Sequence, residues 1–271
     1  MVATIRTPVV AGMFYPLGRD TLKQNLNRLF EGVKKNTFRC VVSPHAGYQY
    51  SGRAAAFAVG SLKASKTFVI LGPNHNVAGS EFALMSSGTW ETPLGRVEID
   101  PVLAKTLGRC EVLAEDELAH MHEHSIEVQL PFMQHRFGTF KFVPVSIANI
   151  DYSDEFLKKC EVLGKHIAKA IKGKNTGVVA SSDFSHYLPA KIADAKDAKA
   201  IERIKKLDAA GFFRVLEDNN ASVCGYGPIA VVMYAAKHLG MKGATVIKHS
   251  NSGDATGDYA SVVAYYAIGF R

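Results

Sequence analysis

Apolar positions recur along the chain with two spacings, and together they predict alternating helices and strands. In residues 20–33, Leu22, Leu26, Leu29 and Phe30 fall on one helical face, which is typical of an amphipathic helix. Short apolar runs rich in β-branched and aromatic residues predict strands at 38–42, 67–71, 140–147, 177–180 and 259–270. Longer periodic stretches predict helices at 53–62, 101–107, 116–130, 155–171, 195–217 and 228–239.

This alternation predicts an α/β fold, with a central, mostly parallel or mixed sheet flanked by helices on both faces. Residues 82–99, which contain Gly88, Trp90, Pro93 and Gly95, predict a hairpin-like excursion from that pattern. Because no repeat, linker or shift in composition divides the sequence, residues 1–271 are predicted to form a single domain. A chain of this length buries enough apolar surface to fold without a structural metal, so a metal site would serve function.

Composition and charge exclude several classes of protein. The net charge is +7, but the basic residues are dispersed rather than gathered with aromatic residues, so nucleic-acid binding is not expected. Its four cysteines form no CxxC pair, and no apolar stretch approaches the ~20 residues of a membrane span. With no signal-like amino terminus, a reduced, cytoplasmic protein without membrane contact is expected.

Candidate chemistry follows three of the predicted strands. The strand at 38–42 leads into His45, the strand at 67–71 into His75, and the strand at 177–180 into Asp183 and His186. Ligands of open α/β sheets bind beyond the carboxyl ends of the strands. If these strands are parallel neighbours, the side chains share one crevice, and the Pro and Gly residues beside the histidines would shape tight loops around it.

Cys224 adds a sulfur to this set. It lies just before a predicted helix, with Pro228 suited to the first helical turn. A helix amino end is expected to lower the pKa of the thiol and favour the thiolate that binds metals. A buried, inert cysteine is the equally simple alternative.

The predicted helix at 116–130 carries His120 and His124 one turn apart. Because the HExxH pattern of metalloproteases is absent, His124 is expected to line the pocket, and His120 and His122 to lie at the surface. A serine hydrolase that uses Ser181, Ser182 or Ser185 with Asp183 and His186 stays open at this point, although no GxSxG elbow is present.

At these residues the sequence resembles the Memo family, whose prokaryotic members are called AmmeMemoRadiSam system protein B. The matching segments follow one another along nearly the whole chain. They are Pro44-His45-Ala46-Gly47-Tyr48, Gly72-Pro73-Asn74-His75, Glu123-His124-Ser125-Ile126-Glu127, Ser181-Ser182-Asp183-Phe184-Ser185-His186 and Cys224-Gly225.

The resemblance implies a fold similar to the class III, LigB-type extradiol dioxygenases. It also implies that His45, His75 and Cys224 are metal ligands, and that His186, Asp183 and His124 lie beside the metal as catalytic groups. A thiolate in place of the usual carboxylate makes the site softer, so iron or copper is expected, with zinc as a further option. A dioxygenase-like oxidoreductase would bind a small aromatic diol, with His186 moving the proton and Asp183 orienting it or adding a ligand.

The alternative is a non-enzymatic module that binds a peptide or another partner in the same cleft. Tyr15, Tyr48, Tyr50 and Trp90 would then form an aromatic rim, unless they are ordinary core or surface residues. The name of the prokaryotic group also implies an association with radical-SAM and AMMECR1-like proteins.

Overall fold

The computed structural model describes residues 4–34 and 38–271. The strands are β1 (Ile5–Arg6), β2 (Cys40–Ser43), β3 (Thr67–Pro73), β4 (Phe82–Leu84), β5 (Thr89–Thr92), β6 (Gly95–Ile99), β7 (Ala114–Glu115), β8 (Lys141–Ile147), β9 (Thr176–Ser181), β10 (His186–Leu188), β11 (Ala244–Asn251) and β12 (Val262–Phe270). The helices are α1 (Arg19–Leu29), α2 (Tyr48–Gly60), α3 (Pro101–Leu107), α4 (Leu118–Met121), α5 (Gln129–Phe137), α6 (Asp154–Ile171), α7 (Ala190–Lys205), α8 (Ala209–Asp218), α9 (Tyr226–His238) and α10 (Gly253–Thr256).

The strands of the described residues join in one mixed, twelve-stranded sheet. Its centre is the parallel set β8-β3-β9-β2, and β12 continues this set antiparallel to β2. Nearly every residue of these four strands is buried, as expected for parallel strands covered on both faces. The strands β5 and β6 form an antiparallel hairpin, which confirms the excursion predicted between residues 82 and 99.

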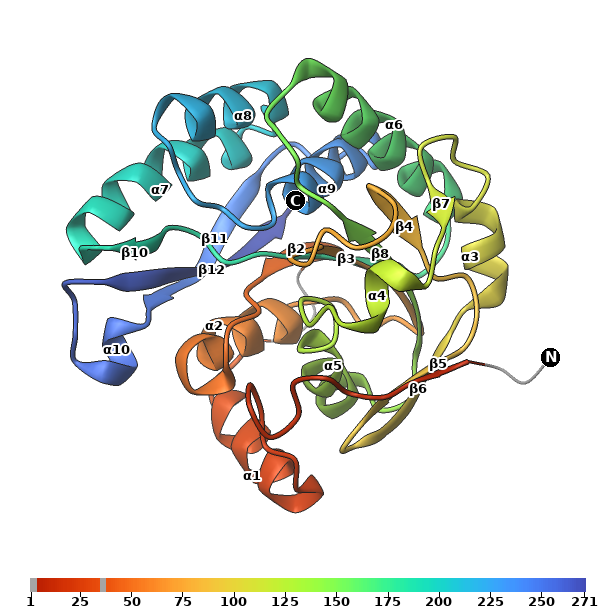
Figure 1. The fold of residues 1–271 in the computed structure, drawn as a ribbon, viewed down its shortest axis with the longest axis horizontal. Coiled ribbons are helices and arrows are strands. Elements are labelled where there is room, and N and C mark those ends of the chain that lie inside the picture. Colours follow the sequence, from red (N-terminus) through yellow and green to blue (C-terminus); the bar gives the residue numbers. More distant parts are fainter. Residues whose placement is uncertain (1–3, 35–37) are drawn as a thin grey trace.

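Two groups of helices cover the sheet (Figure 1). Helices α6, α7, α8 and α9 lie on one face, where α6 packs along α9. Helices α1, α2 and α5 lie on the other face and contact one another. The predicted α/β fold, with a mixed sheet and helices on both sides, is therefore confirmed.

Two predicted helices are wrong in their extent. The stretch 195–217 is split into α7 and α8, because Leu207 adopts a positive φ of 53° and the Asp208 side chain caps α8 by accepting the N–H of Gly211. The stretch 116–130 holds only the four residues of α4 and the start of α5. Between them the Glu123 carboxylate accepts the N–H groups of His124 and Ser125 and so competes with helix formation.

Strand β11 was not predicted, because it ends in the polar run 248–251 and is only half buried along most of its length. It is held by antiparallel pairing with β12, and polar residues are tolerated there because the strand has one neighbour. Among the helices of the described residues, none combines the length and apolar character needed to cross a bilayer.

Candidate functional site

The three strands that lead into the candidate residues are immediate neighbours in the order β3-β9-β2, and all three are parallel. Ser43 at the end of β2 pairs with Ser181 at the end of β9. His45, His75 and Asp183 each follow the last residue of their strand by two positions. The sheet therefore brings these residues together at one edge, as the sequence predicted.

His45 is buried, with 2% of its surface exposed, and its ring is oriented by a chain of neutral hydrogen bonds. The Ser181 hydroxyl donates its proton to the Ser125 carbonyl (2.6 Å) and accepts the Gln129 side-chain amide (2.9 Å). His45 Nδ1 lies 2.9 Å from the same hydroxyl oxygen and must therefore donate its N–H to that oxygen. This fixes the tautomer of His45, with a lone pair on Nε2 that faces the Cys224 sulfur.

His75 is oriented by a carboxylate instead. Glu123 Oε1 lies 3.0 Å from His75 Nδ1, and Glu123 Oε2 accepts the backbone N–H of His75 at 2.6 Å. Burial alone would raise the pKa of Glu123, but the hydrogen bond and charge of His75, with His124 and the Ser125 N–H, lower it to about 2. An ionised carboxylate can only accept, so His75 Nδ1 donates and Nε2 keeps its lone pair.

Cys224 is brought to the two imidazoles by a turn that is tied to two strand ends. Asn149, just after β8, donates to the Cys224 carbonyl and accepts the N–H of Gly227. Gly225 N–H donates to the Ser182 hydroxyl (3.0 Å), and a Cβ at Gly225 would overlap the Ser181 carbonyl. Only glycine therefore permits this approach.

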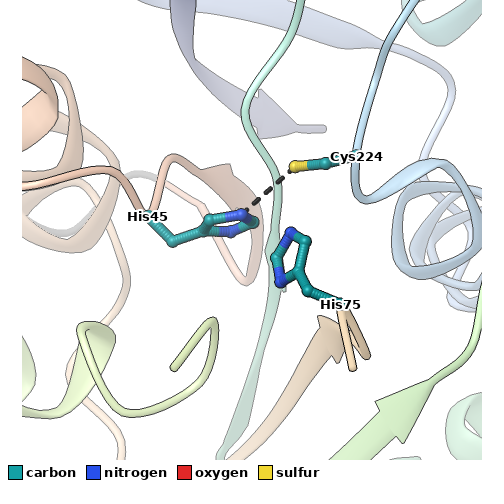
Figure 2. Close-up of side chains that lie close together, drawn as sticks. All are labelled: His45, His75 and Cys224. Carbon is teal, nitrogen blue, oxygen red and sulfur yellow. Dashed lines mark hydrogen bonds between the residues drawn. The ribbon is translucent and has the colours of Figure 1, made fainter. Parts of the chain in front are cut away.

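The three side chains converge. The ligand atoms of His45, His75 and Cys224 all lie within 4.8 Å of one another, and Cys224 Sγ is 3.1 Å from His45 Nε2. Figure 2 shows them reaching one point from three separate segments. Two imidazole lone pairs and one sulfur form a donor set that can hold zinc, copper or iron.

The expected acidity of Cys224 is wrong for the thiol by itself. Burial and the nearby Asp183 charge hold the pKa of the Cys224 thiol well above its ordinary value. The N–H of Asp183, which donates to the sulfur at 3.1 Å, and the Ser182 hydroxyl lower the pKa but do not outweigh these two causes. A positive charge beside the sulfur, such as that of a metal ion, would favour the thiolate.

His186 and Asp183 lie in the cavity that borders this cluster. The Nδ1 of His186 lies 2.8 Å from the Ser222 carbonyl, which can only accept, so His186 Nε2 also carries a lone pair. Burial lowers the pKa of His186 and keeps its ring neutral. Burial raises the pKa of Asp183 to about 7, although its carboxylate accepts the N–H of His45 at 2.9 Å.

The cavity has a volume of about 480 Å³, within the range of small-molecule sites. Its wall is rich in apolar and aromatic side chains, and no Lys or Arg of the described chain lines it. Of the four aromatic residues suggested as a rim, Tyr50 lines the cavity, whereas Tyr15, Tyr48 and Trp90 are core residues at most 3% exposed. Other large side chains that line the cavity are Met13, Phe14, Tyr187 and the buried Tyr265.

A serine nucleophile is contradicted by the structure. Ser181, Ser182 and Ser185 are fully buried. Their hydroxyl protons are donated to the Ser125 carbonyl, the Asp183 carbonyl and the Asp197 carboxylate. None of the three lines the cavity, so none can attack a substrate there.

Comparison with known proteins gives a family for this arrangement. The sequence model described as "Memo-like protein" matches residues 6–269. The chain belongs to the Memo family. MEMO1 family proteins of Methanosarcina barkeri and Methanopyrus kandleri are 43% and 44% identical to it, over 97% and 98% of this chain and 99% of each relative.

A solved structure shares the fold at much lower sequence similarity. It is an uncharacterized protein of Escherichia coli K12, 13% identical, with a TM-score of 0.58, which covers 86% of this chain and 99% of its own. At that identity the likeness concerns the fold alone.

The segment 116–130 of this Memo-family chain differs most from its prediction. His124 lines the cavity, and its ring stacks on that of His75 with centroids 4.9 Å apart. His122 is exposed as expected, but the prediction for His120 is wrong, because its ring is fully buried and packs edge-on against Trp90.

Two residues that orient the imidazoles were missed by the sequence analysis. Glu123 is 48 positions from His75, and Ser181 is 136 positions from His45. Glu123 stands beside His124 in one of the matching segments, which was the available signal, but only the fold shows which imidazole it meets.

Proposed function

We propose that this protein is a metal-dependent redox protein that binds iron or copper through His45, His75 and Cys224 and acts on a small aromatic diol. The observation that carries the proposal is the pair of imidazoles whose Nδ1 atoms are both engaged, which leaves both Nε2 lone pairs beside one sulfur. Ligand histidines commonly have this second hydrogen bond, since it fixes the ring and its tautomer. The implied likeness of the fold to extradiol dioxygenases agrees with this chemistry.

When bound, such a metal would pass electrons from the diol to dioxygen, the oxidant, and polarise the hydroxyl oxygens of the diol. The protein would do the rest. His186 Nε2 is suited to accept a hydroxyl proton, because its ring is neutral and held by the Ser222 carbonyl. Asp183 would orient the incoming hydroxyl from beside His45. Phe14, Tyr50 and Tyr265 would cover the ring of the substrate and exclude water.

The cavity also limits the substrate. Asp183 is the one carboxylate among its lining residues, and no cation of the described chain faces it. Away from the metal and its imidazoles, a carboxylate or phosphate on the substrate's substituent would find no Lys or Arg on the cavity wall, which disfavours burying a charged substituent there. We therefore expect a diol whose substituent is uncharged.

The proposal is tested by metal analysis of protein purified without oxygen. Cys224→Ala and His75→Ala are each expected to reduce bound iron or copper from near one equivalent to a small fraction, while His166→Ala, at an imidazole distant from the cluster, retains it. Cobalt(II) replacement gives a second readout, since a thiolate ligand produces a charge-transfer band that Cys224→Ala should remove. Unchanged metal content in both ligand variants would disprove the site.

A binding module remains the second candidate, and one feature favours it. Tyr187 at the mouth of the cavity is 78% exposed and has a positive φ of 57°, while Met13 on the same rim is 72% exposed. A non-glycine residue held in this conformation often marks a functional position. Oxygen uptake with a panel of catechols separates the candidates, since a binding module would consume none.

A further inference from the structure

A second cavity, of about 440 Å³, lies between α1, the β5–β6 hairpin and the end of α5. It shares no lining residue with the cavity beside His45 and His75. Arg19, Lys23 and Arg96 line it together with His135, and none of its lining residues is acidic. The two cavities therefore differ in charge: one has a carboxylate and no cation, and the other has three cations and no carboxylate.

Two of these cations are placed at a cost to the protein. Arg19 and Lys23 are four residues apart in the first turns of α1, where like charges repel and the helix dipole disfavours positive charge. Within the described residues neither side chain forms an ion pair or hydrogen bond. Although Asp20 lies in the same turn, it forms no ion pair with either cation among the described residues, so both remain available to an anion.

The third cation is held in place. Arg96 Nε donates to Glu91 Oε1 at 2.8 Å across the β5–β6 hairpin, which leaves its two terminal nitrogens available. The Gln134 side chain accepts the Thr92 hydroxyl and donates to the Gly95 carbonyl. These hydrogen bonds hold the β5–β6 hairpin against α5 and so order this wall of the cavity. A guanidinium presented in this way suits the paired oxygens of a phosphate.

We propose that this cavity binds a small phosphorylated molecule with at least two negative charges and about the size of a mononucleotide. The volume lies in the range of small-ligand sites, and three cations around one cavity do not form the extended basic face that duplex nucleic acid requires. Leu94, Val97 and Phe140 provide an apolar floor against which the uncharged part of the ligand would pack. This site is independent of the proposed metal function.

Isothermal titration calorimetry at low ionic strength tests the proposal, with ADP and inorganic pyrophosphate as probes and adenosine as the uncharged comparison. The double variant Arg19→Gln/Lys23→Gln is expected to bind ADP about tenfold more weakly, or worse. The matched control Lys172→Gln/Lys174→Gln removes two exposed lysines from another surface and should bind as the wild type does. Thermal melts verify that both double variants are folded.

A Cys224→Ala variant separates this site from the metal cluster and should bind ADP normally. Equal losses in the two double variants would show only a general charge effect and overturn the proposal. Absence of ADP and pyrophosphate binding up to about 1 mM, equally tight binding of adenosine, or loss of binding in Cys224→Ala would overturn it as well.

Discussion

His45 and His75 lie with their ring centroids 5.2 Å apart, yet their surroundings differ in charge and exposure. His45 is buried and held by the neutral hydroxyl of Ser181, whereas the His75 side chain is 35% exposed and held by the ionised Glu123. Both arrangements leave a lone pair on Nε2. The comparison teaches that one donor geometry can be prepared either by a buried neutral network or by a carboxylate near solvent.

The support of His75 by Glu123 depends in turn on a buried ion pair between Arg6 and Glu127. Arg6 donates to Glu127 at 2.7 Å, to the His120 carbonyl at 2.8 Å and to the Glu123 carbonyl at 2.5 Å. Glu127 also accepts from the Tyr15 hydroxyl at 2.6 Å. This network fixes the segment that carries Glu123 and His124, so the support of His75 extends to the amino-terminal strand β1.

Loss of the Arg6 guanidinium should destabilise the protein most. Arg6→Met leaves the Glu127 carboxylate buried without its ion partner, which should cost about 3–5 kcal/mol of unfolding free energy. For a chain of this size, thermal unfolding should move down on the order of 10 °C. Arg96→Met is the matched control, because its pair with Glu91 is exposed and worth at most about 1 kcal/mol. A melting temperature within about 2 °C of the wild type would contradict the structural importance of this network.

A smaller effect compares the two imidazole supports directly. Glu123→Gln should weaken metal binding about 10–100-fold, because it removes a charge-assisted hydrogen bond and points an amide at the His75 backbone N–H. Ser181→Ala should weaken it less, since the hydrogen bond it removes is neutral. Competition with a calibrated chelator measures both affinities. If Ser181→Ala has the larger effect, the buried network rather than the carboxylate dominates the site.

The smallest effect is on pH dependence. Burial lowers the pKa of His75, but the hydrogen bond and charge of Glu123 outweigh it and raise the pKa above its ordinary value. Burial, and then the charges of nearby histidines, lower the pKa of His45 well below it. His75 therefore adds stability below pH ~6.5 that is lost as pH rises through its folded pKa. His45 has the opposite effect on stability. Because its ring resists protonation in the folded state, the free energy of unfolding decreases as pH falls below ~6.5.

Imidazole nitrogen NMR of chelator-treated protein follows this difference. With decreasing pH, the His75 ring should take up its proton first, while the His45 ring should still be neutral near pH 6. Glu123→Gln should bring the His75 titration to lower pH, and the His45 ring should still be neutral near pH 6. Protonation of His45 before His75 would show that the assigned surroundings are reversed.

Much of the fold was predictable because local periodicity survives in the structure. The strands β3 and β9 and the helices α3 and α6 lie within two residues of their predicted limits, since their apolar patterns are buried as the spacing indicated. The segment 116–130 was predicted as a helix because His120, His124 and Glu127 have helical spacing. Its backbone departs from that pattern because Glu123 and Glu127 bond to groups distant in sequence.

The sequence alone shows which residues follow the buried strands. A β-rich run and a turn with Pro and Gly place His45 and His75 there, and a third such run leads directly into Asp183. The fold adds that β3, β9 and β2 are neighbours, which nitrogen of each imidazole keeps its lone pair, and that the Cys224 thiol is made less acidic rather than more. These features could not be predicted, because strand order, hydrogen-bond partners and burial arise from contacts between residues far apart in the chain. Local spacing carries no record of such contacts.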